Sequence, residues 1–232
     1  ALSLPGSDIA TTTRNDFIAF LSVLNLSPFV LKPASGSESE VVDKLKVNWS
    51  SEYNNWEADR TLTPDQRVKG EAVYSDEYLA DRAALLLWKL KLAAEDFKTT
   101  DGSYTKAKAD AFFSDVGEVL QINLGSNWTN PADKTRYIFG ANQSSGTEVL
   151  SGGSKSDRMY GGGGDDVLYG YDGNDHLEGN AGNDTLSGGE GKDTLLGGAD
   201  NDTLEGGKDN DSLKGGKGVD TYKYTSGDGW DT

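Results

Sequence analysis

An aspartate recurs at every ninth position over 72 of the 232 residues of this chain, without one omission. Two positions after each Asp stands Met, Leu or Tyr, and five positions before it stands Gly. Clear copies read GGGGDDVLY from Gly161, GNAGNDTLS from Gly179 and GGEGKDTLL from Gly188. So regular a period predicts a repeat fold in which each unit stacks on its neighbours. The eight nonapeptides span 152–223, and their aspartates are Asp157, Asp166, Asp175, Asp184, Asp193, Asp202, Asp211 and Asp220.

Each nonapeptide divides into a turn and a short strand. Its Gly, Asn and Asp residues adopt positive φ easily, whereas the Thr-Leu-x segment after the Asp leaves room for a strand of roughly three residues. The middle residue of such a strand faces opposite to its neighbours, so the apolar column points inward and the flanking Thr, Ser, Lys and Glu point to water. The predicted inward side chains are Met159, Leu168, Leu177, Leu186, Leu195, Leu204, Leu213 and Tyr222.

Two nonapeptides complete one circuit of a flattened helix, so aspartates 18 positions apart lie above each other. At the strand spacing of about 5 Å, two unit charges repel by roughly 1 kcal/mol in water and by up to about 3 kcal/mol at an effective dielectric of 20. The two resulting carboxylate ladders therefore call for cations. Turns that offer only oxygen donors suit a hard divalent ion, and Ca²⁺ accepts irregular shells better than Mg²⁺.

The charge balance points the same way. Residues 152–232 hold 22 of the 30 Gly and 17 acidic against 7 basic side chains, and so carry −10 of the total −16. This acidity, without a basic cluster, argues against binding to nucleic acid or to an anionic membrane surface. The chain has no Cys, which excludes disulfides and thiolate metal sites. No apolar run is long enough for a membrane span, and no N-terminal signal peptide is visible.

The pattern G-G-x-G-x-D-x-U-x, with U apolar, resembles that of the RTX (repeats-in-toxin) family. This resemblance implies a right-handed parallel β-roll in which each Ca²⁺ lies between turn n and turn n+2, held by the Asp of both turns and by backbone carbonyls. It implies six sites, from the pairs Asp157 with Asp175, Asp166 with Asp184, Asp175 with Asp193, Asp184 with Asp202, Asp193 with Asp211, and Asp202 with Asp220.

The same resemblance places the carbonyl donors at the second and fourth positions of the lower turn and at the first and third positions of the upper turn. The implied carbonyl donors are Gly162, Gly164, Gly173, Gly179, Ala181, Gly182, Gly188, Gly189, Glu190, Gly191, Gly197, Ala199, Gly206 and Lys208. The first repeat departs from the pattern, because Lys155 stands where Gly favours positive φ, so the site that uses Asp157 is expected to be the weakest or empty. Other departures at such positions are Tyr171, Asn180, Asp200 and Asp209.

The chain is predicted to be α plus β in two parts. Residues 1–140 read as mainly α-helical, either a domain or the end of a larger upstream domain, and 141–232 form the roll, with degenerate caps at 143–151 and 224–232. In the first cap, Glu148 keeps the phase of the aspartates. The expected helical segments are Arg14 to Leu24, the segment after Ser37 up to Val47, a turn starting at Thr63 and Pro64, a helix capped by Ser75 and reaching Phe97, and Thr105 to Ile122.

Catalytic chemistry is not expected in this chain. Its one histidine, His176, lies at a strand-entry position and is predicted to be a solvated surface residue, so neither a Ser-His-Asp triad nor an H-E-x-x-H helix can form. No G-x-S-x-G is present. Paired carboxylates such as Glu52 with Glu57 are typical of solvated helix faces. The parent protein could be an RTX lipase with its catalytic residues upstream, a pore-forming toxin or a surface adhesin.

By resemblance, the protein is secreted by a Gram-negative bacterium through a type I channel that reads a C-terminal signal, which this chain lacks, and it folds with calcium outside the cell or at the cell surface. A disordered charged linker is the alternative, although disorder does not require an apolar residue at one position in nine. Eight inward side chains are too few to offset about 1 to 2 kcal/mol of ordering cost per residue, so the metal-free roll is expected to be disordered. The helical part is expected to fold without calcium.

Overall fold

The computed structural model describes residues 50–83, 113–116, 119–123, 136–140 and 146–232. The chain divides into two compact units. The first comprises residues 1–62 and 74–104, and the second comprises residues 63–73 and 105–232.

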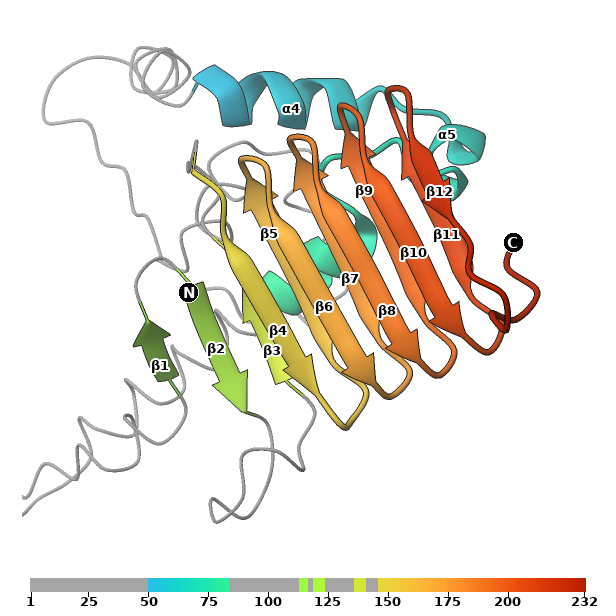
Figure 1. Cartoon of the computed structure of the whole chain (residues 1–232). Coiled ribbons are helices and arrows are strands. Elements are labelled where there is room, and N and C mark those ends of the chain that lie inside the picture. The colour runs from blue at the N-terminus through green and yellow to red at the C-terminus, as the bar shows by residue number, and fades with distance from the viewer. Residues whose placement is uncertain (1–49, 84–112, 117–118, 124–135, 141–145) are drawn as a thin grey trace, which may run out of the picture. The chain divides into compact units, whose positions relative to one another are not determined.

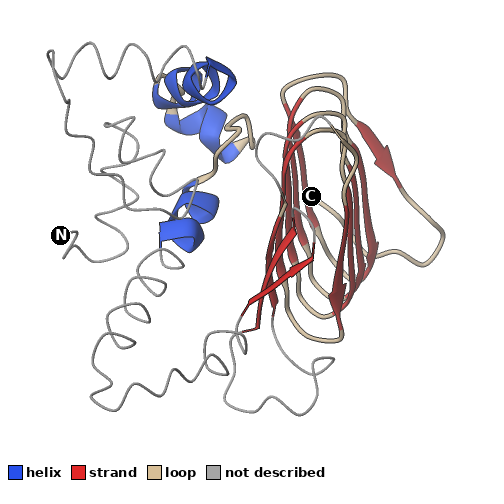
Figure 2. Cartoon of the chain, turned by 90° about the vertical axis from the view of Figure 1, so that its left-hand side faces the viewer, coloured by secondary structure: helices blue, strands red, loops and turns tan. Residues whose placement is uncertain are grey.

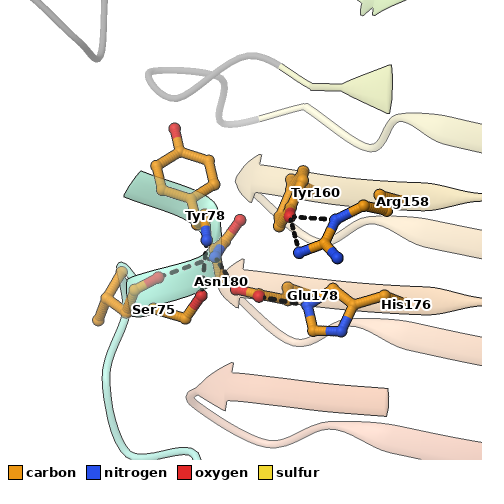
Figure 3. A network of polar contacts seen from close by, with 8 residues as sticks. Ser75, Tyr78, Arg158, Tyr160, His176, Glu178 and Asn180 are labelled. Atoms are coloured by element: carbon orange, nitrogen blue, oxygen red, sulfur yellow. Dashed lines mark hydrogen bonds and ion pairs between the residues drawn. The ribbon is translucent and has the colours of Figure 1, made fainter. Parts of the chain in front are cut away.

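The described part of the first unit is helical. Helix α4 (Ser50–Arg60) lies in the part predicted to be mainly helical, although it was not among the segments named there, and the helix capped by Ser75 is confirmed over residues 76–83. The Ser75 Oγ accepts a hydrogen bond from the backbone N–H of Tyr78 at 2.9 Å (Figure 3), which satisfies a donor that the helix itself leaves open. The predicted helices over Arg14 to Leu24 and up to Val47 lie outside the described residues.

The second unit begins with the short helix α5 (Pro64–Val68), at the predicted turn. Thr63 and Gln66 cap it reciprocally: the Thr63 Oγ accepts the N–H of Gln66 at 3.3 Å, and the Gln66 Oε1 accepts the N–H of Thr63 at 3.0 Å. Pro64 occupies the first helical position, where its missing N–H costs nothing.

The rest of this unit is a parallel β-solenoid of about five turns over residues 137–223, which confirms the predicted β-roll. Successive strands alternate between a seven-stranded sheet in the order β1-β2-β3-β5-β7-β9-β11 and a five-stranded sheet in the order β12-β10-β8-β6-β4 (Figure 1). Figure 2 shows the two sheets in profile, facing each other across the roll and joined by turns at both edges. The roll strands are β3 (Arg136–Phe139), β4 (Val149–Gly153), β5 (Arg158–Gly163), β6 (Val167–Asp172), β7 (His176–Ala181), β8 (Thr185–Glu190), β9 (Thr194–Ala199), β10 (Thr203–Lys208), β11 (Ser212–Gly216) and β12 (Thr221–Lys223).

The strands pair in the register that the nine-residue period predicts, with equivalent positions of every second repeat side by side. Strand β10 pairs with β8 so that Leu204 lies beside Leu186, and the other roll pairs from β4 to β12 keep the same offset of 18 residues. The strands are longer than the three residues expected, however. Strand β8 (Thr185–Glu190), for example, continues into the glycine-rich positions of the next repeat, and the chain turns at the residues that follow.

Positive φ falls at the second and fourth positions of every repeat from the second repeat on. Glycine fills most of them, with Gly189 at 116° and Gly191 at 119° as examples, because a Cβ is disfavoured there. The four exceptions keep the same conformation with φ between 74° and 76°, and they are the predicted departures Tyr171, Asn180, Asp200 and Asp209. Lys155, at the fourth position of the first repeat, does not have positive φ.

The apolar column fills the space between the two sheets. Its members are buried, and the column is longer at its N-terminal end than the eight repeats predict: Ile138, Leu150, Met159, Leu168, Leu177, Leu186, Leu195, Leu204 and Leu213. The prediction is wrong for Tyr222, which is 41% exposed. The reason is its place in β12, which ends the five-stranded sheet and pairs with β10 alone.

The predicted helix over Thr105 to Ile122 is also wrong in its described part. Strands β1 (Phe113–Val116) and β2 (Val119–Asn123) pair antiparallel there, with Phe113 opposite Ile122. Strand β2 pairs antiparallel with β3, and β3 pairs parallel with β5, so this hairpin extends the sheet of the roll ahead of residue 141. Val116, Val119 and Ile122 are β-branched and suit a strand, and an open sheet edge outweighs their weak helical spacing.

Candidate metal centre

The six predicted aspartate pairs are brought together in two ladders, one along each edge of the roll. In each pair the Oδ1 of the upper Asp accepts the backbone N–H of the lower Asp, at 2.7 to 3.1 Å. The register of the strands therefore aligns these carboxyl groups turn by turn. We call Asp157, Asp175, Asp193 and Asp211 the first ladder, and Asp166, Asp184, Asp202 and Asp220 the second ladder.

The second carboxyl oxygen of most ladder residues is buried without a hydrogen-bond partner among the described residues. This holds for the Oδ2 atoms of Asp166, Asp175, Asp184, Asp193, Asp202 and Asp211. Buried polar atoms in native proteins are nearly always paired, because an unpaired one forfeits its hydration, and a buried charge without a partner costs far more. Six such atoms in two regular rows indicate groups that are built to receive a cation.

A backbone carbonyl lies beside each of these oxygens in the interior turns. A Cβ built on Gly161 would lie 2.7 Å from the carbonyl oxygen of Gly179 and 2.8 Å from the Oδ2 of Asp166, so only glycine fits. Gly161 does not have positive φ, and close approach is therefore the reason for the glycine. The next turns of both ladders repeat this contact, and the carbonyls that approach there are those of Gly188, Gly197, Gly206 and Gly215.

The other predicted carbonyl donors lie in the same turns. The third-position carbonyls of Ala181, Glu190 and Ala199 accept hydrogen bonds from the fourth-position N–H groups of Gly164, Gly173 and Gly182, at 2.9, 2.9 and 3.4 Å. Each carbonyl keeps a second lone pair. Second-position residues pair with one another in neighbouring strands, as Gly162 does with Asn180 and Gly189 with Gly207. Gly191 approaches the carbonyl of Gly173, and Lys208 lies beside Glu190, with which its side chain forms an ion pair. Their role as ligands stays a prediction.

Burial makes the interior carboxyl groups hard to ionise. It raises the pKa of Asp193 to about 6 and that of Asp184 to about 8, and the charges of the ladder neighbours add to the rise, those of Asp202 and Asp166 in the case of Asp184. The pKa values of Asp166, Asp175 and Asp202 rise to about 7 for the same first reason. Hydrogen bonds from the backbone oppose this effect but do not reverse it. Without a cation, the ladders are therefore partly protonated at neutral pH.

At the first rung of the first ladder, both carboxyl oxygens of Asp157 have hydrogen-bond donors from the protein. The backbone N–H of Gly153 donates to the Oδ2 of Asp157 at 2.6 Å, and that of Arg136 donates to its Oδ1 at 2.5 Å. The Arg136 guanidinium also donates to the carbonyl of Gly152 at 2.6 Å. Hydrogen-bond donors and the positive Arg136 side chain thus occupy this turn. This arrangement supports the prediction that the Asp157 site is the weakest. Arg136 lies outside the repeat register, so the period of nine does not predict its role.

His176 is not the solvated surface residue that was predicted. Its side chain is only 16% exposed, and its Nε2 lies 2.6 Å from the Oε1 of Glu178, which is itself buried (Figure 3). The segment 63–73 contacts the same sheet at Asn180, whose Nδ2 donates to the carbonyl of Val73 at 2.8 Å, and at Lys214, against which Gly70 packs. This polar network lies on the sheet face, apart from the ladders in the turns.

Side chains alone do not complete a metal site in the described part of the chain, where no three His, Cys, Asp or Glu residues cluster suitably. A cation between two rungs would need backbone carbonyls as well, and those are the groups that the turns present. Such oxygen-only donor sets suit Ca²⁺. Within the same described part, no helix has the length and apolarity needed to cross a membrane.

A parallel β-solenoid with paired, buried carboxylates in glycine-rich turns defines a metal-binding repeat module. The family model described as RTX calcium-binding nonapeptide repeat (4 copies) matches residues 143–177, 169–204 and 196–231. Residues 143–231 are therefore RTX calcium-binding repeats, a module typical of secreted bacterial proteins. Comparisons with curated proteins and with solved structures gave no significant match.

Proposed function

We propose that the roll is a calcium-gated folding unit of a secreted bacterial protein, which binds Ca²⁺ between successive rungs of its two ladders and folds only where calcium is abundant. Extracellular calcium modules bind at about 10⁻⁴ to 10⁻³ M. A roll with that affinity stays unfolded in a calcium-poor cytosol, as passage through a type I secretion channel requires, and folds outside the cell.

The observation that carries this proposal is the set of six buried Oδ2 atoms without a hydrogen-bond partner in the described structure. The residues that would hold an ion are the two aspartates of a pair with the carbonyls of their turns, as in Asp166 with Asp184 beside Gly179. A bound Ca²⁺ supplies positive charge to oxygens that otherwise repel one another. Six ions would change the −10 of residues 152–232 to about +2.

Folding and binding are coupled because the roll has a thin core. One apolar side chain per nonapeptide faces inward, and the remaining inward positions are mostly glycine. Ordering each residue costs about 1 to 2 kcal/mol in backbone entropy, which a single buried Leu in nine residues does not offset. The free energy of ion binding then becomes part of the free energy of folding.

A calcium titration of the full chain, followed by circular dichroism and calorimetry, tests the proposal. We expect β-sheet signal to appear cooperatively near millimolar Ca²⁺ and to remain absent with the same concentration of Mg²⁺. A spectrum that ignores calcium would show that the ladders are only a charged surface.

Two variants connect this transition to the ladders. Asp184→Asn removes a charge shared by two predicted sites and should raise the calcium midpoint by about tenfold or more, because even changes outside the ligand shell cost about 10- to 100-fold in metal affinity. Asp165→Asn is the matched control: Asp165 lies outside the ladders, and Asn183, which donates to it, shows that Asn suits this position of the turn. Its midpoint should stay near that of the wild type, and equal shifts in the two variants would contradict the assignment.

A further inference from the structure

The last four residues, Gly229–Thr232, repeat the stacking contacts of a nonapeptide although they lie outside the nine-residue register. The Oδ1 of Asp231 accepts the backbone N–H of Asp211 at 3.1 Å, as the Oδ1 of Asp220 accepts that of Asp202 at 3.1 Å. The N–H of Thr232 then donates to the carbonyl of Asp211 at 2.9 Å, which is the contact that follows each ladder aspartate in the interior turns. Asp231 therefore stands where the next rung of the first ladder belongs.

The two residues before Asp231 repeat the preceding positions of the turn. Gly229 lies on the carbonyl of Asp209, as fourth-position glycines lie on the carbonyl one turn below. The N–H of Trp230 donates to the Oδ1 of Asn210 at 2.8 Å, as that of Val219 does to the Asn one turn below it. Four consecutive positions thus repeat the interior contacts, although Gly229 lacks the positive φ of the interior fourth positions. The separation of Asp231 from Asp211 is 20 residues instead of 18, which is why the period alone does not reveal it.

The carboxyl oxygens at this rung are in the same condition as those of the interior. Asp211 is 3% exposed, and its Oδ2 has no hydrogen-bond partner among the described residues. The Oδ2 of Asp231 is likewise buried without a partner in that part of the chain. Two carboxyl groups that share a hydrogen-bonded rung and leave two buried oxygens unsatisfied form the arrangement found at the four interior pairs, which are Asp166 with Asp184, Asp175 with Asp193, Asp184 with Asp202, and Asp193 with Asp211.

We infer that Asp211 and Asp231 form a seventh calcium site, which closes the C-terminal end of the first ladder; this inference rests on the proposed function of the other six. The site is more open than the others: Asp231 is only partly buried, whereas the ladder aspartates from Asp157 to Asp211 are buried. We therefore expect this site to be weaker than the interior sites and to fill last.

The test counts the calcium ions bound per chain by equilibrium dialysis at saturating Ca²⁺, on the full chain and on two variants. Asp231→Asn should bind one ion fewer than the wild type. Asp228→Asn is the matched control, because it removes a charge close to Asp211 as well, but at a carboxylate that accepts the N–H of Thr225 in its own turn and no ladder N–H. It should bind the wild-type number of ions.

Hydrogen exchange on the same samples shows where the change occurs. In Asp231→Asn, calcium should still protect residues 166–202 but no longer protect residues 224–232. Equal ion counts in the two variants would overturn this inference while leaving the other six sites intact. Loss of protection throughout the roll would also overturn it, because a terminal site should be dispensable for the turns below. A wild-type chain that binds no calcium would overturn the proposed function itself.

Discussion

The interior turns of the roll and its first rung carry almost the same sequence pattern but treat their aspartates differently. In the interior, each ladder residue such as Asp184 keeps one buried oxygen without a described hydrogen-bond partner. At the first rung, both oxygens of Asp157 accept backbone N–H groups, and the Arg136 guanidinium binds the adjoining carbonyl. The nonapeptide by itself therefore does not decide whether a turn needs an ion; the neighbouring turn does.

The difference teaches how such a roll can begin and end. A rung inside the stack has an identical turn on each side, so its carboxylates can only face other carboxylates. At its beginning, residues from outside the repeat supply donors and a positive charge, as Arg136 does. The N-terminal end can thus be stabilised by the protein, whereas the interior depends on what it binds.

The largest difference between interior and end should appear in the apolar column. Leu186→Ala, in the middle of the roll, should destabilise the calcium-loaded protein by about 2 to 5 kcal/mol, because the two sheets cannot collapse onto the cavity. Tyr222→Ala, in the exposed end strand, should cost at most about 1 kcal/mol, mainly through the hydrogen bond that its hydroxyl accepts from Gly215. Chemical unfolding in saturating calcium measures both, and similar losses would mean that the end strand is packed like the interior.

Glycine substitutions should separate the same two regions by a smaller margin. Gly161→Ala places a methyl group against the Gly179 carbonyl and the Asp166 carboxylate, which should cost about 1 to 3 kcal/mol and raise the calcium midpoint. Gly153→Ala meets only the movable end of Arg136, at 3.3 Å, and should be milder. Melting temperatures in calcium provide the comparison; a milder effect at Gly161 than at Gly153 would contradict the close approach that we describe.

The interior should also give the metal-free roll a dependence on pH. The folded pKa values of Asp166, Asp184 and Asp193 lie at about 6 to 8, above the ordinary value of 3.8. At pH values between 3.8 and these folded pKa values, the folded state therefore binds more protons than the unfolded state. That contribution is fully present below about pH 4 and is lost as the pH rises through 6 to 8. Calcium-free protein should therefore show more β-sheet signal at pH 5 than at pH 8, and the opposite order would refute the burial of unpaired carboxylates.

The smallest effect is expected at the first rung. Asp157→Asn removes a charge that Arg136 already balances, and its amide oxygen still accepts one of the two N–H groups, from Gly153 or from Arg136, that Asp157 accepts. The calcium midpoint should shift by less than about twofold, or roughly 0.4 kcal/mol. Asp175→Asn, one rung higher, is the comparison and should shift it far more. Equal shifts in calorimetric titrations would show that the first rung binds calcium like the others.

The repeat made the roll predictable. A strict period of nine determines which residues stack, and so the two ladders, the inward column from Met159 to Leu213 and the positive φ at Asp200 and Asp209 followed from the sequence. Each of these features depends only on neighbouring turns that obey the same pattern. The nonapeptide and its copies one turn away therefore contain what is needed to predict them.

The features that the sequence did not reveal involve residues outside that period. Arg136 reaches the first rung from β3, and Asn180 is bound by the carbonyl of Val73, which lies 107 positions away. The hairpin of β1 and β2 forms because a sheet edge is available for pairing, which weak local helical spacing does not show. Asp231 is displaced by two residues from the register and becomes visible only through its hydrogen bonds.

Hydrogen exchange of the full chain at neutral pH, with and without saturating Ca²⁺, tests the central claim most directly, because it reports on each region separately. We predict that residues 161–213 change from unprotected to protected when calcium is added, while α4 and residues 76–83 keep the same protection in both conditions. A roll that is fully protected after calcium has been removed would contradict the account, since its carboxylate ladders would then be stable without any cation.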